Sequence, residues 1–146
     1  MDSMTIQLDA PTLVLAGALL LALVTVESGG WFLTRVVRGR VAANALQASF
    51  FRAGHAHAAV LLVLSLANLA LLGGVSGLPE LWAWIARLGV PIAALLMPAG
   101  FFLSVLGREP QKPNRLIALL WVGAGVLTLG LLASGLALIV AGASAA

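Results

Sequence analysis

The chain has 146 residues, of which 62% are hydrophobic and only 9% charged, and its mean hydropathy is +1.11. A soluble domain carries about 25% charged residues, so a soluble enzyme is excluded. Disorder is excluded because disordered chains are poor in apolar residues. The net charge is +3 and there is no cysteine, which excludes disulfides, thiolate metal sites and a catalytic cysteine.

Four apolar stretches are long enough to cross a membrane as helices, which takes roughly 20 residues each. In chain order they run over about 12–33, 53–72, 81–106 and 116–140. Runs such as Leu61-Leu62-Val63-Leu64 do not alternate with polar residues, so a β-barrel is not expected. The segment 41–51 has good helix formers and no Gly or Pro, which favours an early start of the second helix over a separate interfacial helix. We expect one all-α membrane domain over 1–146, a compact bundle of four transmembrane helices.

The positions of the basic residues predict how the spans are oriented, because Lys and Arg collect in short cytoplasmic loops. Seven of the eight basic residues lie at two connections between spans. The connection between the first and second spans has Arg35, Arg38, Arg40 and Arg52, and the one between the third and fourth spans has Arg108, Lys112 and Arg115. Both termini are therefore expected outside. Arg87 is the exception, near the outer end of the third span beside Trp82 and Trp84. Because the basic residues flank spans, we expect them to contact anionic lipid and not nucleic acid.

Glycine and proline interrupt the regular helical pattern in three spans. Gly29-Gly30 in the first span allow a bend or the close approach of another helix. Pro91 and Pro98 each remove a backbone donor from the third span, so this helix is predicted to bend and its freed carbonyls need partners. The fourth span pairs small residues four apart, such as Gly130 and Ser134, which is typical of tight helix packing.

Polar and ionisable side chains within a span are costly, and they are therefore candidates for function. The set consists of Glu27 in the first span and of Arg52, His55, His57, Ser65 and Asn68 in the second. At about 100° per residue, Arg52 shares one face with His55, and His57 shares another with Ser65 and Asn68. The two histidines therefore point about 160° apart and do not bind one metal ion together, because helical metal pairs are spaced i, i+3 or i, i+4.

Glu27 is expected to pair with one of these polar residues. Helix rise places Glu27 about 12 Å, and His57 about 7 Å, from the arginines at the inner ends of their spans. We predict that Glu27, Arg52, His55 and His57 converge near the cytoplasmic third of the bundle. Glu27 then faces either Arg52 and His55 or His57 alone, as a structural ion pair, a proton-relay carboxylate or a cation site. Each histidine is equally compatible with bonding to headgroups, water or loop backbone.

The string Phe51-Arg-Ala-Gly-His-Ala-His-Ala58 opens an apolar helix and resembles the Arg-x-x-His-x-His start of haem-copper oxidase subunit I and of small four-span bacterial proteins similar to it. The resemblance covers about eight residues. It implies a helical bundle in a bacterial inner membrane, with one haem b held by His55 or His57 and by Met97 or a histidine of a second protomer. The continuation Ala58-Ala59-Val60 departs from that pattern, and there is no further histidine for a binuclear copper centre. Oxygen reduction by this chain alone is therefore excluded.

Three functions remain open. The first is a haem- or metal-binding accessory redox subunit using His55, His57 and Met97. The second is an oligomeric transporter or channel for ions or small solutes, based on Glu27 beside Gly29-Gly30 and on the proline-broken third span. The third is a structural subunit of a larger membrane complex. No independent catalytic motif is found, and the expected partners are the lipid bilayer and either further copies of the chain or another membrane subunit.

Overall fold

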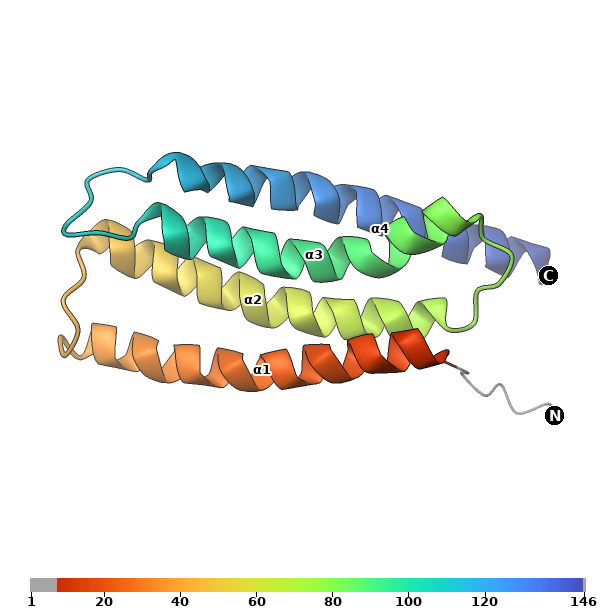
Figure 1. Ribbon diagram of the computed structural model, residues 1–146, viewed down its shortest axis with the longest axis horizontal. Coiled ribbons are helices and arrows are strands. Elements are labelled where there is room, and N and C mark those ends of the chain that lie inside the picture. The colour runs from red at the N-terminus through yellow and green to blue at the C-terminus, as the bar shows by residue number, and fades with distance from the viewer. Residues whose placement is uncertain (1–7, 146) are drawn as a thin grey trace.

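The computed structural model describes residues 8–145, and these form four long helices in an up-and-down arrangement (Figure 1). They are α1 (Ala10–Val37), α2 (Ala45–Leu72), α3 (Glu80–Ser104) and α4 (Ala118–Ser144), with a short 3-10 turn, η1 (Arg115–Ile117), before α4. Each is long and apolar enough to cross a membrane. The predicted all-α fold with four candidate spans is therefore confirmed.

Helix α2 begins eight residues before the predicted start of its span, as the composition of segment 41–51 favoured. The cause is a capping box: the Asn44 side chain accepts from the Gln47 N–H, and the Gln47 side chain accepts from the Asn44 N–H. The same two side chains reach the α3–α4 connection, where they donate to the carbonyls of Val105, Gly107 and Pro110. These bonds hold the two loop connections together.

The helices lie side by side in chain order, α1 against α2, α2 against α3 and α3 against α4 (Figure 1). This is an open row, whereas a compact bundle would bring α1 and α4 into contact. In an 18-residue apolar stretch of each helix, half of the residues of α3 are buried, compared with 11% for α1 and 17% for α4. The helices at the two ends of the row therefore keep most of their surface uncovered by the rest of the chain.

Small residues explain why α3 and α4 pack closely. The backbones of Gly89 and Gly130 meet directly, and Gly123 abuts the Met97 side chain. Gly130 and Ser134 both face α3, so the predicted tight packing of the fourth span is confirmed and its partner is α3.

Helix α3 changes direction near its N-terminal third (Figure 1), as predicted from the proline at position 91. Pro91 lacks the N–H that would bond the carbonyl one turn earlier. In that turn the Ala86 carbonyl accepts two side-chain hydrogen bonds, from Asn68 of α2 at 2.8 Å and from Ser134 of α4 at 3.1 Å. This buried polar contact ties three helices together at the bend.

The start of α1 and the end of α4 lie at one end of the row, which we call the terminal end (Figure 1). The α1–α2 and α3–α4 connections lie at the other, which we call the basic end because most of the arginines are there. This is the arrangement that the distribution of charge requires. That the basic end faces the cytoplasm remains a prediction.

Candidate functional site

The seam between α1 and α2 is built around His55. A Cβ atom added to Gly29 would lie 3.1 Å from the His55 Nδ1, and one added to Gly30 would lie 3.6 Å from its Cε1. The two glycines therefore make room for the imidazole, which is the close approach predicted for this pair. One turn toward the basic end, the rings of Phe32 and Phe51 meet edge to face at 5.4 Å, which fixes the same register between the helices.

His57 points to the opposite side of α2, as its two-residue offset from His55 predicted. Its ring lies 4.9 Å from the ring of Phe101 in α3, and its Nδ1 is 2.8 Å from the Ala53 carbonyl oxygen. Because a carbonyl oxygen only accepts, Nδ1 carries the proton in this bond. In the neutral imidazole the lone pair then resides on Nε2, which makes Nε2 of His57 the ring nitrogen suited to binding a metal.

The predicted convergence on Glu27 is wrong. Within the described residues Glu27 is exposed and takes part in no ion pair and no side-chain hydrogen bond. Its depth is as expected, because the contact of His55 with Gly29 sets Glu27 level with residue 57 of α2. The direction of the Glu27 side chain differs from the prediction. Glu27 lies two residues from Gly29, about 160° around the helix, and because Gly29 faces α2, Glu27 points away from it.

Arg52 also lies apart from the others. It is exposed and forms no ion pair in the described part of the chain. It lies about 160° around α2 from Gly54, and Gly54 packs on the Phe101 and Phe102 side chains of α3. Arg52 therefore points away from α3.

Ser65, Asn68 and Met97 are core residues. Ser65 is fully buried and donates to the Leu61 carbonyl of its own helix, and Asn68 holds the bend of α3. Met97 belongs to the main hydrophobic cluster and its Cγ lies against Gly123 of α4. The methionine therefore packs on α4, so the pairing of Met97 with His55 or His57 as two ligands of one haem has no support in these contacts.

The surroundings of the two histidines differ in the room that they leave for a ligand. No group of three His, Cys, Asp or Glu side chains that could hold a metal ion occurs among residues 8–145. His55 is packed into the α1–α2 seam, and the tight contact of Gly54 with Phe102 leaves no slot for a porphyrin between α2 and α3 at this level.

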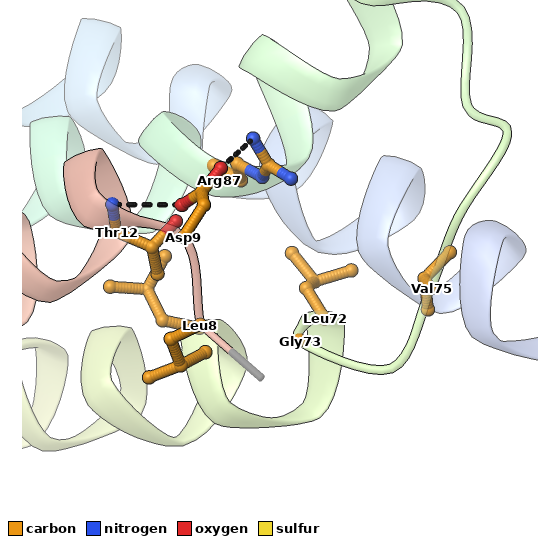
Figure 2. A pocket seen from close by; sticks show the side chains of 8 residues that line it. Leu8, Asp9, Thr12, Leu72, Gly73, Val75 and Arg87 are labelled. Carbon is orange, nitrogen blue, oxygen red and sulfur yellow. Dashed lines mark hydrogen bonds and ion pairs between the residues drawn. The ribbon is translucent and has the colours of Figure 1, made fainter. Parts of the chain in front are cut away.

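A charged pair that the sequence analysis did not single out lies at the terminal end. Asp9 is the N-cap of α1: its Oδ1 accepts from the Thr12 N–H at 3.0 Å, and its Oδ2 lies 3.5 Å from Nη1 of Arg87 in α3 (Figure 2). Hydrogen bonds from Thr12, and then the Arg87 guanidinium, hold the pKa of the Asp9 carboxyl below its usual value. Asp9 two residues before Pro11 was a readable helix-start signal, but its partner 78 residues later was not.

The Asp9–Arg87 pair lies at the junction of two hollows. One, of about 190 Å³, is walled by Leu69, Leu72 and Val75 (Figure 2). The other, of about 370 Å³, runs between α1 and α3 beside Leu15 and Trp84. These two hollows are not lined by His55, His57 or Glu27.

No protein-family model, curated protein or solved structure matches the chain. The resemblance of residues 51–58 to the oxidase subunit I pattern therefore stays a prediction.

Proposed function

We propose that this protein is a structural subunit of a membrane assembly and that it associates with further copies of itself through the uncovered side of the α1–α2 hairpin. The observation that supports this most is the exposure of Glu27. Helix α1 has 28 residues, about 42 Å at 1.5 Å each, and Glu27 lies ten residues, or about 15 Å, from its basic end. With about 30 Å of hydrocarbon to cross, that depth lies inside the hydrocarbon.

A carboxylate facing lipid is unfavourable. An acidic side chain near the centre of a bilayer costs about 2.5–3.5 kcal/mol even on insertion scales, which give the lowest values. No cation of the described chain pairs with Glu27, so the compensating group is expected from a neighbouring molecule.

Arg52 of α2 is exposed as well, and we take it as the opposite charge with which a second copy of this hairpin pairs. A two-fold axis along the membrane normal places α1 of one copy opposite α2 of the other. Glu27 of each copy then lies opposite the Arg52-bearing helix of its partner. The offset along the helices is five residues, about 7.5 Å, which the long arginine side chain spans. Two symmetric Glu27–Arg52 pairs result.

Charge reversal tests the proposal. Wild-type protein in lipid nanodiscs or mild detergent is expected to be a dimer or larger by light scattering. Glu27→Arg and Arg52→Glu are each expected to weaken it by facing like charges across the interface. Two tagged chains, one with each substitution, are expected to associate again when co-expressed, because both cross pairs then have opposite charges.

The mixed experiment separates pairing between chains from pairing within one, since an internal Glu27–Arg52 pair is not restored by mixing. Arg38→Glu, an exposed position in the α1–α2 connection, is the matched control and should leave the assembly intact. A wild-type monomer in a bilayer, or failure of the mixed pair to associate, would overturn the proposal.

We propose as a second function that His57 is an axial haem or metal ligand in an accessory redox subunit. The bond from Nδ1 to Ala53 supports it, because it orients the ring and leaves Nε2 as the binding nitrogen. Purified protein expressed with haem supply would then show a Soret band that His57→Ala abolishes and His55→Ala retains. Absence of the band, with no stoichiometric iron, copper or zinc, would refute this function. The transporter alternative gains no support, because Glu27 borders none of the hollows described above.

A further inference from the structure

We infer that the Asp9–Arg87 pair is a binding site for the headgroup of a zwitterionic phospholipid, with the lipid phosphate on Arg87, its ammonium on Asp9, and an acyl chain in the apolar slot between α1 and α3. The site is separate from the Glu27 and Arg52 face and from His57.

The two charges are paired loosely and remain accessible. Arg87 Nη1 and Asp9 Oδ2 are 3.5 Å apart, and the side chains keep 41% and 49% of their surface exposed. Guanidinium has five N–H donors, and Arg87 donates no hydrogen bond within residues 8–145 beyond this ion pair. On the carboxylate, Oδ1 accepts from the Thr12 N–H and Oδ2 faces Arg87. Cation and anion therefore stand side by side with unused hydrogen-bonding capacity.

The space around the pair fits an amphipathic molecule. Asp9, Thr12 and Arg87 border both hollows, so the charges stand where the two meet; Figure 2 shows the smaller of them. Beyond them, the larger hollow of about 370 Å³ is walled by apolar side chains, namely Pro11, Leu15, Trp84 and Leu88. A phosphate and an ammonium would occupy the charged junction, and a hydrocarbon chain would lie along the apolar wall.

The depth of the pair agrees with a headgroup. Asp9 is the cap of α1 and so marks the very end of that helix. The helix is about 12 Å longer than a hydrocarbon core of about 30 Å, which leaves the cap at the level of the polar headgroups. Trp82 and Trp84 are exposed at the same end, as expected of residues that lie at a membrane interface.

The geometry also favours a zwitterion over a purely anionic lipid. A lone arginine would attract any phosphate, whereas Asp9 repels the phosphate unless an ammonium beside it offsets this repulsion. Because hydrogen bonds from Thr12 and the nearby Arg87 guanidinium lower the pKa of Asp9, its carboxylate is charged at neutral pH. We therefore expect phosphatidylethanolamine to bind more tightly than phosphatidylglycerol.

The test measures lipid binding by the delipidated full-length protein, by native mass spectrometry and by the thermal shift that each lipid causes. Phosphatidylethanolamine is expected to bind at least tenfold more tightly than phosphatidylglycerol. Arg87→Leu should abolish binding of both lipids, and Asp9→Asn should remove the preference between them. Inorganic phosphate and glycerophosphoethanolamine, which lack the acyl chains, are expected to give no shift.

Two further variants keep the result interpretable. Leu15→Trp, which fills the apolar slot without changing charge, should weaken lipid binding even if Arg87→Leu folds poorly. Arg108→Leu, in the connection at the basic end, should bind lipid like wild type. Equal binding of both lipids by wild type would overturn the preference for a zwitterion. Lipid binding unchanged in Arg87→Leu and Leu15→Trp would show that the pair only connects the start of α1 to α3.

Discussion

The contact between Gly89 and Gly130 provides a direct test of the packing of α3 on α4. A Cβ atom added at position 89 would lie 2.5 Å from the Gly130 Cα and 3.1 Å from its N, where an ordinary contact is 3.4–4 Å. Both neighbours are backbone atoms, so no side-chain rotation relieves the overlap. The helices would have to separate by about 1 Å near the bend of α3, where the Ala86 carbonyl accepts from Ser134.

Gly89→Ala is therefore expected to lower the free energy of unfolding by about 1–3 kcal/mol, the usual cost of an overpacked core. Gly125→Ala is the matched control, because nothing lies within 4 Å of its added Cβ and it is on the same helix as Gly130. Replacing an exposed helical glycine by alanine is neutral or stabilises by up to about 1 kcal/mol.

The assay is unfolding of the purified protein by SDS in mixed micelles, followed by circular dichroism and by the fluorescence of the four tryptophans. The prediction requires Gly89→Ala to unfold at a lower SDS fraction than wild type, and Gly125→Ala at the same or a higher one. If the two variants unfold together, the close backbone contact does not hold α3 and α4 together and the reasoning fails.

Three other substitutions test the polar contacts of the fold. Asn68→Ala removes a buried hydrogen bond to the Ala86 carbonyl and is expected to cost about 1–2 kcal/mol in the same unfolding assay. Gly29→Ala should leave stability nearly unchanged and instead shift the imidazole NMR signals of His55, because the added Cβ meets only the movable ring. For Asp9, the lowered pKa means that its stabilising contacts are present above its unfolded pKa and are lost as the pH falls through the folded value. Asp9→Asn should therefore flatten the acid limb of a plot of melting temperature against pH.

Each of these three substitutions has a control variant at a position where the corresponding contact is absent or exposed. Ser144→Ala removes an exposed bond to a carbonyl of its own helix and should cost little, in contrast to Asn68→Ala. Gly17→Ala adds a Cβ in open space on α1 and should leave the His55 signals in place. Glu109→Gln, at an exposed position, should not change the acid limb. Asn68→Ala as mild as Ser144→Ala, or equal His55 shifts in both glycine variants, would contradict the geometry.

Features that depend on spacing along one helix were readable from the sequence. The four spans follow from apolar length, because about 30 Å of hydrocarbon requires about 20 residues. His55 and His57 diverge because two residues turn a helix by about 200°. The bend of α3 follows from Pro91, which cannot donate to the preceding turn. The capping box at Asn44 likewise involves only neighbouring residues, and it explains the early start of α2.

The rotation of each helix against its neighbours was decided by tertiary structure alone. Glu27 had the right depth for the predicted cluster, but α1 places Gly29 against His55, and this contact turns the carboxylate outward. The meeting of Asp9 with Arg87 depends in the same way on where the packing of α1 on α2 places the start of α1 relative to α3. Periodicity states which residues share a face, whereas steric fit between small and large side chains of different helices determines which face is covered. That fit is a property of pairs far apart in the chain, and for this reason the candidate site had to be taken from the structure.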